Sequence, residues 1–363
     1  MKLLAYLLVM VSLICVGCSR EEKPVVVDTS LRLMVKFNSL YGYCDRGGIT
    51  VIPPQYQSAS MFSGGFASVR TAEGKNGYID VNGKMVVPPA FDAGSLFLEG
   101  KAAVRKGGKW GYIDQTGKLI IDYEFLSTFG FTEGLAAVMV LKDGKGRWGY
   151  IDAKGRMVIK PQFEYAAQFS EGLAAVKING KYGYIDKTGA VRIQPQFFEG
   201  VMFRDGVAMV KINGKFGLIG YIDHTGNMVI PARYSEGTSF NEGVASVSTG
   251  KGWQLIDRTG KPVIERNFTF STVFSQGLAP VMDKGKVGYI DKNGSTAIKP
   301  QFEAASIFVD GLAPVKVSGK CGYIDRSGKL VVEPRFEWDQ RIIDQYTHYY
   351  THFVTASTQG KQL

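Results

Sequence analysis

The sequence predicts an all-β fold in which about nine β-meander units of ~34 residues follow one another in tandem. The first observation is a phrase of glycine, aromatic residue, isoleucine and aspartate that returns along the chain. Clear copies begin at Gly77, Gly111, Gly149, Gly183, Gly220, Gly288 and Gly322, and degraded copies begin at Gly42 and Gln254. Successive copies lie 35, 34, 38, 34, 37, 34, 34 and 34 residues apart, and the chain is rich in glycine (45 residues) and aromatics (12%). A fixed period in this range is typical of solenoids, propellers and arrays, in which neighbouring units complete each other's core.

Residues 169–203 show how one unit is built. The apolar run 173–178 predicts a first strand, and Asn179-Gly180 predicts a tight hairpin because both residues accept positive φ. The second strand is expected over 181–186, followed by a turn from Asp186 to a glycine. The third is expected over 190–193 and should end at the proline step that follows, since proline donates no hydrogen bond to a sheet. Each unit is therefore predicted as a three-stranded meander.

The units are expected to form an open solenoid or superhelix, with a closed propeller-like ring as the alternative. Nine units exceed the usual four to eight blades of a propeller, and three strands per unit fall short of four. The corner of each unit, residues 198–206 in the copy described above, could supply the fourth strand.

The chain begins with features of an exported lipoprotein. Residues 1–17 combine Lys2 with an apolar stretch too short to span a membrane comfortably, which is typical of a signal peptide. Their end resembles a bacterial lipobox, and this resemblance implies that Cys18 is the lipidated anchor on the membrane. By its resemblance to enteric lipoprotein sorting signals, Ser19 after the cysteine implies the outer membrane. Residues 18–30 are predicted to be a tether, 31–336 the repeat domain and 337–363 a C-terminal cap and tail.

The repeats resemble the bacterial WG repeat, also called the KWG repeat. The resemblance spans about residues 31–336 and rests on three sub-motifs that recur in order. They are the Glu-Gly-Leu-Ala strand at 171–174, the Trp-Gly-Tyr-Ile-Asp strand at 110–114 and 148–152, and an Ile-x-Pro-Gln-Phe end at 159–163. The family implies a β-repeat body, often on secreted or lipid-anchored proteins, and it supplies no catalytic residues.

The repeated aspartates are predicted to be structural turn residues rather than metal ligands. An aspartate at the first position of a turn accepts hydrogen bonds from backbone amides ahead of it, whereas a calcium site needs several converging oxygen donors. The seven aspartates of the clear copies are Asp80, Asp114, Asp152, Asp186, Asp223, Asp291 and Asp325. No metal site, cofactor or catalytic residue is predicted from the sequence.

Recognition is predicted where the units differ. One unit gains residues at 142–147 and another carries an insert at 216–220, so Lys145, Arg147, Phe216 and Leu218 are the candidate partner surface. The net charge of +10 is spread over turn lysines without a dense basic run, which argues against nucleic acid.

We therefore expect a lipid-anchored protein of the cell envelope that acts as an interaction scaffold without catalysis. Its partner is expected to be another envelope protein or a cell-wall polymer. The alternatives are a carbohydrate-binding protein that uses Trp110, Trp148 and Trp253, and a hydrolase with carboxylates from different units.

Two further expectations concern the ends of the array. Residues 337–353 should cover the open end of the last unit, and residues 346–353 contain many strand-forming residues. Cys44 and Cys321 occupy slots on opposite sheet faces, so both are expected to be packed thiols.

Overall fold

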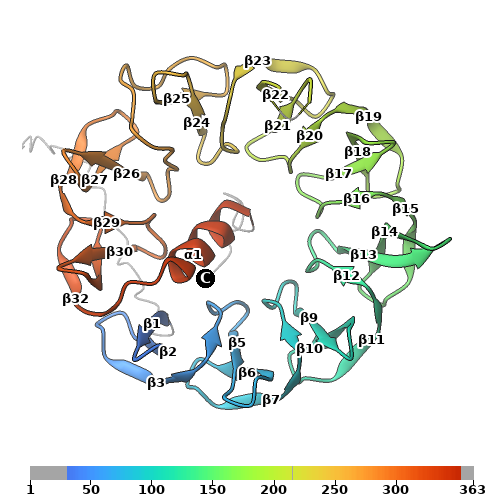
Figure 1. Cartoon of the computed structure of the whole chain (residues 1–363), viewed down its shortest axis with the longest axis horizontal. Helices are drawn as coiled ribbons and strands as arrows, with labels where there is room; N and C mark the ends of the chain where they lie inside the picture. Colours follow the sequence, from blue (N-terminus) through green and yellow to red (C-terminus); the bar gives the residue numbers. More distant parts are fainter. Residues whose placement is uncertain (1–30, 215, 353–363) are drawn as a thin grey trace, which may run out of the picture.

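The computed structural model describes residues 31–214 and 216–352, and within them the predicted all-β array of nine units is confirmed. Nine small antiparallel sheets follow one another around a central axis (Figure 1). The first three hold β1 (Leu33–Phe37), β2 (Leu40–Cys44) and β3 (Thr50–Tyr56); β4 (Ser58–Ala59), β5 (Phe66–Arg70), β6 (Asn76–Asp80) and β7 (Met85–Phe91); β8 (Ala93–Gly94), β9 (Lys101–Lys106), β10 (Lys109–Asp114) and β11 (Leu119–Phe125). We number these sheets units 1 to 3.

The remaining sheets are units 4 to 9. Units 4 to 6 hold β12 (Ser127–Thr128), β13 (Leu135–Lys142), β14 (Lys145–Asp152) and β15 (Met157–Phe163); β16 (Tyr165–Ala166), β17 (Leu173–Ile178), β18 (Lys181–Asp186) and β19 (Val191–Phe197); β20 (Glu199–Gly200), β21 (Ala208–Lys211), β22 (Ile219–Ile222) and β23 (Met228–Tyr234). Units 7 to 9 hold β24 (Val244–Ser248) and β25 (Trp253–Asp257); β26 (Leu278–Asp283), β27 (Lys286–Asp291) and β28 (Thr296–Phe302); β29 (Ala304–Ala305), β30 (Leu312–Val317), β31 (Lys320–Asp325) and β32 (Leu330–Glu337).

Unit 5 has the two predicted central strands and hairpin, but its outer strand differs from the prediction. Asn179 and Gly180 both have positive φ (49° and 77°), as a tight hairpin requires. The outer strand β19 does not end at Pro195 but continues to Phe197. Its pairing with β18 shifts between Ile193 and Phe197, and this irregularity places the proline where a missing donor costs no ladder hydrogen bond. The corner after β19 contributes the short innermost strand β20 of unit 6, and a strand of this kind gives most units four strands.

The glycine of the repeated phrase is required by this outer strand. A Cβ atom on Gly183 would lie 2.5 Å from the carbonyl oxygen of Ile193 and 2.7 Å from the nitrogen of Pro195. The matching glycines of the other complete units meet backbone atoms at 2.4–2.7 Å, so each of them lets two strands approach closely.

Neighbouring units are joined by the same contacts throughout the array. In units 1 to 6 and 8 the buried tyrosine of the repeated phrase donates a hydrogen bond to a carbonyl 17 residues ahead, at the start of the next unit, as Tyr150 does to Ala167 (2.7 Å) and Tyr184 to Val201 (2.9 Å). Leu255 takes this position in unit 7. The turn glycine of a unit packs on an aliphatic side chain of the preceding unit, as Gly189 does on Ile159. Each tyrosine thus ties the core of its own unit to the next.

The two ends of the array meet, so the chain returns on itself instead of ending in two free edges. Tyr323 of unit 9 donates to the carbonyl of Met34 in unit 1 (3.0 Å), and Gly48 of unit 1 packs on Val332 of unit 9. One apolar cluster joins residues of both units, among them Cys44 and Cys321. This is the closed ring that the sequence left as the second arrangement. The sheets remain separate, and none closes into a barrel.

The C-terminal segment lies inside the ring rather than over an open end. Residues 340–352 form the helix α1 (Gln340–His352), which corrects the expectation of strand-forming residues there. Asp339 caps the helix by accepting a hydrogen bond from the backbone N–H of Arg341 (2.9 Å). Ile342 is buried among Met34, Ala59 and Ile307, so α1 covers the inner sides of units 1, 2 and 9 (Figure 1).

Candidate interaction surface

Lys145 and Arg147, predicted from the first insert, lie in the longest hairpin of the ring. The strands β13 and β14 have eight residues each, against six in β17 and β18 of unit 5, so this hairpin projects beyond the outline of the ring (Figure 1). Lys145 is exposed and Arg147 is half-buried. Leu141, which pairs with Gly146 across the hairpin and has no side chain opposite, is 66% exposed.

Phe216 and Leu218, predicted from the second insert, lie at the corresponding position of unit 6. Here the insert does not lengthen the strands: β21 and β22 have only four residues each, and residues 212–214 and 216–218 lie between them outside any strand. The N–H of Ile212 donates to the carbonyl of Leu218 (3.0 Å), which closes the loop. Phe216 is 93% exposed at its end and Leu218 is 42% exposed.

Sequence reasoning missed a second group of exposed aliphatic side chains, at the start of the outer strands of units 4, 5 and 6. Met157, Val158, Val191, Met228 and Val229 are each between 38% and 45% exposed, while the third residue of each strand is buried. In unit 8 the matching positions hold Thr296 and Ala297. The only sequence signal was an aliphatic residue at one or both of the positions before the buried isoleucine, which looks like an ordinary strand.

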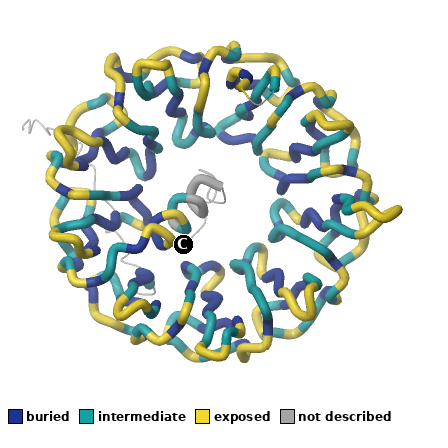
Figure 2. Tube along the Cα trace, viewed as in Figure 1, coloured by how far each residue is buried: buried dark blue, intermediate teal, exposed yellow. Residues whose placement is uncertain are grey.

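These two groups fall on the same third of the ring. Among the described residues, eleven large hydrophobic side chains are exposed, and eight of them belong to units 4 to 6. We call these eight the apolar arc; its members are Leu141, Met157, Val158, Val191, Phe216, Leu218, Met228 and Val229. Figure 2 shows that exposed residues follow the outer perimeter of the ring, where β15, β19 and β23 succeed one another.

The apolar arc lies on the part of the chain that carries much of the positive charge. Residues 127–234 contain 14 Lys and Arg against 9 Asp and Glu, a balance of +5 within a total of +10. Within this balance Asp152 pairs with Arg156 and Asp186 pairs with Arg192, each at 2.6 Å, so these charges neutralise each other. Units 4 to 6 therefore hold most of the exposed large hydrophobic side chains and half of the net positive charge.

The tryptophans of the carbohydrate-binding alternative are packed into separate parts of the core. Trp148 is buried, stacks on Phe129 with ring centroids 5.3 Å apart and contacts Tyr165 of the next unit at 6.1 Å. Trp110 and Trp253 are half-buried, and each packs against a different apolar cluster. The structure does not bring the three rings together on one surface.

The repeated aspartates fix the turns that follow the second long strand. In unit 5 the Oδ1 atom of Asp186 accepts hydrogen bonds from the backbone N–H groups of Thr188 (2.9 Å) and Ala190 (3.1 Å). The hydroxyl of Thr188 and the guanidinium of Arg192, together with these two amides, lower the pKa of Asp186 to about 2. The same pair of amide contacts recurs at Asp80, Asp114, Asp152, Asp223, Asp291 and Asp325. Among the described residues no group of three or more His, Cys, Asp or Glu is placed to hold a metal ion.

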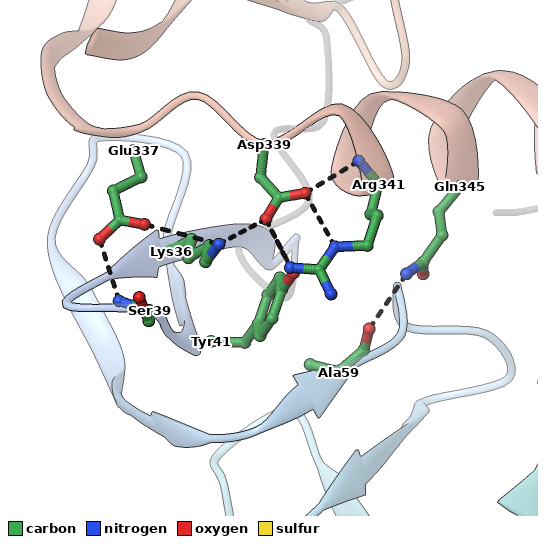
Figure 3. Close-up of polar contacts among 8 residues, drawn as sticks. All are labelled: Lys36, Ser39, Tyr41, Ala59, Glu337, Asp339, Arg341 and Gln345. Carbon is green, nitrogen blue, oxygen red and sulfur yellow. Dashed lines mark hydrogen bonds and ion pairs between the residues drawn. The ribbon is translucent and has the colours of Figure 1, made fainter.

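A polar cluster at the junction of units 9 and 1 was not predicted (Figure 3). Asp339, whose side chain is 7% exposed, accepts hydrogen bonds from Lys36 (2.8 Å) and Tyr41 (2.9 Å) and pairs with Arg341 (3.0 Å). Burial would raise the pKa of Asp339, but these hydrogen bonds outweigh it and hold the pKa far below its ordinary value. Burial and the Asp339 carboxylate raise the pKa of Tyr41 to about 12. We call these four residues the seam cluster; no spacing in the sequence links them, because 303 residues separate Lys36 from Asp339.

The structure therefore defines a ring protein of tandem β-meander units with an apolar and basic arc on its outer side. The family comparison is specific: the WG containing repeat matches nine times, at residues 41–75, 77–110, 110–145, 148–182, 182–216, 219–253, 255–286, 288–321 and 322–338. The chain belongs to the WG-repeat family.

Solved structures with a similar fold have low sequence identity. A eukaryotic initiation factor is 14% identical, with a TM-score of 0.50 over 75% of this chain and 87% of that one. The dehydrogenase NirN in complex with DHE is 16% identical, with a TM-score of 0.45 over 75% and 72%. BamB from Moraxella catarrhalis is 12% identical, with a TM-score of 0.41 over 74% and 95%. The likeness concerns the β-propeller-like fold alone, and no curated protein matches the chain.

The remaining predictions concern the ends of the chain. Cys18, the predicted lipid anchor, and the boundaries of the signal peptide and tether lie outside the described residues. Across residues 31–214 and 216–352 no helix is long and apolar enough to cross a membrane.

Proposed function

We propose that this protein is a lipid-anchored scaffold of the cell envelope, a rigid ring that binds another envelope protein without catalysis. The apolar arc is the observation that carries the proposal. Most soluble monomers expose large aliphatic side chains singly, and a concentration of them on one part of the surface is typical of an interaction site. Here eight of the eleven exposed large hydrophobics described share three of nine units.

The ring holds its units in a fixed arrangement, which suits an interaction scaffold. Buried tyrosine hydrogen bonds and repeated apolar contacts join each unit to the next, so the arc is presented on a body whose parts are held in fixed register. Lipidation at Cys18 would hold this body at the membrane, because several acyl chains together give stable anchoring.

The partner test compares two variants of the full-length protein after gentle detergent extraction of envelopes. The double variant Phe216→Ser, Leu218→Ser changes the arc, and Met282→Ser, an exposed hydrophobic of unit 8, is the matched control. Proteins co-purified with the wild type at mild salt should be retained by the control and lost by the double variant. Co-purification that is the same for both variants, or no stoichiometric partner for the wild type, would count against the scaffold.

The anchor has its own test. Cys18→Ser should abolish incorporation of a labelled fatty acid and move the protein from the membrane fraction to the soluble fraction. Labelling that persists in this variant would remove Cys18 as the anchor.

If the partner is a cell-wall polymer, the wild type should be retained on purified wall material, and the double variant of Phe216 and Leu218 should not.

A further inference from the structure

The hairpins that join the first two long strands of each unit carry most of the net charge of the chain. We call these nine hairpins the hairpin rim; it comprises residues 36–40, 70–76, 105–110, 141–147, 177–182, 211–219, 248–253, 282–287 and 316–321. The rim contains 18 Lys and Arg against 3 Asp and Glu. Six more acids contact it from outside: Asp92, Glu164, Glu199, Glu303, Glu337 and Asp339. The balance is 18 minus 9, or +9, within a total of +10.

The turns at the other end of the second long strand have a different balance. These aspartate turns comprise residues 45–49, 80–84, 114–118, 152–156, 186–190, 223–227, 257–261, 291–295 and 325–329. They contain 11 Lys and Arg against 9 Asp and Glu, or +2, and two of their lysines pair with acids of neighbouring loops. Lys187 contacts Glu133 (3.0 Å) and Lys292 contacts Glu242 (3.2 Å). The positive charge is therefore concentrated at one end of the strands.

Most lysines of the hairpin rim are accessible to a ligand. Lys36, Lys75 and Lys211 are excluded because each is ion-paired within the protein. Eight others are exposed, and within residues 31–214 and 216–352 none of the eight forms an ion pair: Lys106, Lys142, Lys145, Lys181, Lys251, Lys284, Lys286 and Lys320. They belong to units 3, 4, 5, 7, 8 and 9, so unpaired positive charge is spread around the ring and favours an extended anionic surface.

The same hairpins carry isolated apolar side chains. Phe37, Leu141, Phe216 and Met282 come from units 1, 4, 6 and 8, and each is at least 41% exposed. The core of a protein–protein interface is a close-packed apolar patch in which lysine is depleted, and separate apolar tips among lysines do not form one. They suit the surface of a bilayer, where apolar side chains enter the headgroup region and lysines attract anionic lipid.

The arrangement of the hairpins suits a flat partner. Like units follow one another around a central axis (Figure 1), so equivalent turns lie on one circle, and the points of a circle share a plane. A bilayer can therefore touch the hairpins of several units at once. The aspartate turns lie at the opposite end of the second long strand, as β14 shows by running from Lys145 to Asp152, so they stay away from that surface.

We propose that the hairpin rim binds the surface of a membrane that contains anionic phospholipid. The exposed lysines contact the lipid phosphates, and Phe37, Leu141 and Met282 enter the headgroup region. This inference goes beyond the scaffold function because it orients the ring on the membrane. Leu141 and Phe216 of the apolar arc belong to the rim, so a partner of the arc would be met at the membrane surface.

The first experiment measures binding to phospholipid vesicles by co-sedimentation. The parent protein is the full-length chain with Cys18→Ser, which has no acyl anchor; residues 1–17 are the same in every variant. It should bind vesicles of phosphatidylcholine and phosphatidylglycerol at least about tenfold more tightly than vesicles of phosphatidylcholine alone. The triple variant K181Q, K284Q and K320Q should lose at least about tenfold in affinity for the anionic vesicles.

The matched control removes the same charge from the other end of the strands. K118Q, K154Q and K329Q change three exposed lysines of the aspartate turns, none of which forms an ion pair among the described residues. This variant has the same net charge as the first and should bind like the parent. An unchanged thermal unfolding midpoint shows that both variants are folded.

The second experiment tests the orientation of the acylated protein on the same vesicles. An environment-sensitive dye is attached to Leu141→Cys on the rim or to Ala153→Cys in the aspartate turn of the same unit; Cys44 and Cys321 are buried and label slowly. Emission from position 141 should shift to the blue on anionic vesicles, because the dye enters the headgroup region. Emission from position 153 should not change.

Three outcomes would overturn the proposal: equal binding to the two kinds of vesicle, equal losses in the two triple variants, or a blue shift at position 153 in place of position 141. Equal losses would mean that net charge alone draws the protein to the membrane. Failure here is distinguishable from failure of the scaffold function. If the envelope capture still depends on Phe216 and Leu218 while the rim does not bind vesicles, the scaffold stands and only its orientation is wrong.

Discussion

The junction of units 4 and 5 and the junction of units 9 and 1 show two ways of making the same interface. Both use a tyrosine hydrogen bond, from Tyr150 to Ala167 and from Tyr323 to Met34, and both pack a turn glycine on an aliphatic side chain. At the regular junction the outer strand β15 continues directly into β16. At the closing junction, which we call the seam, two distant parts of the chain must find each other. The end of β32 and the residues after it therefore run beside β1, where Glu337 and Asp339 contact Lys36 (Figure 3).

A regular junction has a covalent connection between its two units, whereas the seam has the ion pairs and hydrogen bonds of charged side chains in its place. A covalent connection holds neighbouring units at high effective concentration, and closure between the ends of a long chain costs conformational entropy. The seam cluster and the apolar cluster around Cys44 and Cys321 offset that cost. The seam should therefore be the interface most sensitive to single polar substitutions.

Removing the carboxylate of the seam cluster should have the largest effect. Asp339→Ala leaves the hydroxyl of Tyr41 without its acceptor and leaves the amine of Lys36 with only the longer ion pair to Glu337 (3.6 Å). Removing one partner of a buried pair in this way costs about 3 kcal/mol of unfolding free energy. Urea unfolding followed by circular dichroism measures the loss. Asp92→Ala, which removes the exposed partner of Lys75, is the control and should change the midpoint little. Equal effects of the two variants would contradict a special role for the seam.

Acid should weaken the seam through the same carboxylate. The pKa of Asp339 is held below its unfolded value near 3.9, so its contribution is present above that value and is lost as the pH falls through the acid range. The difference in urea midpoint between the wild type and Asp339→Asn should be large at pH 7 and should shrink below about pH 4. Other aspartates with lowered pKa values affect both proteins equally and cancel in this difference. A difference that is constant from pH 7 to pH 3 would show that Asp339 does not titrate as inferred.

The two cysteines offer a test of whether the seam opens before the rest of the ring. Cys44 and Cys321 lie on opposite faces of their own sheets, yet those faces meet across the seam, and burial raises the pKa of each thiol to about 12. Alkylation of the native protein should be slow, because the thiolate is the reactive form. In Asp339→Ala both thiols should react at urea concentrations below the unfolding transition.

The matched control places a cysteine at a regular junction. Ile185→Cys puts a thiol in the slot of unit 5 that corresponds to Cys44, in a background where Cys44 and Cys321 are replaced by Ala. It should react only with global unfolding, with or without Asp339→Ala. Labelling of both positions at the same urea concentration would mean that the ring opens at no preferred place.

Much of the fold could be predicted from local pattern, and the seam could not. The strands at 173–178 and 181–186 and the hairpin at Asn179-Gly180 have the predicted bounds because alternation and turn chemistry act over a few residues. The predicted outer strand of unit 5 is too short, because a proline is expected to end a strand. In the structure a shift in register accommodates Pro195, and β19 continues to Phe197. Closure depends on a small rotation at each junction, summed over nine units, and no short segment contains that sum.

The candidate surface was likewise only partly visible in the sequence. Phe216 and Leu218 stand out because they interrupt the repeat, and the structure places both at the surface. Met157, Val158 and Val229 keep to the repeat, so nothing in the sequence distinguishes them from the half-buried aliphatic residues at the same positions of other units. The helix α1 escaped prediction because its residues favour strands locally, while its cap at Asp339 and the burial of Ile342 are tertiary contacts.

The smallest expected effect tests what the two junctions share. Tyr323→Phe and Tyr184→Phe each remove one hydroxyl that donates to a backbone carbonyl of the next unit, at 3.0 Å and 2.9 Å respectively. Because both rings are buried and the phenyl ring is retained, each variant should lose about 1 kcal/mol of unfolding free energy, the usual net value of one hydrogen bond. Equal losses in urea unfolding would show that the seam, once closed, is an ordinary junction to which the seam cluster has been added. A loss at Tyr323 several times that at Tyr184 would instead mean that the tyrosine itself takes part in holding the ring closed.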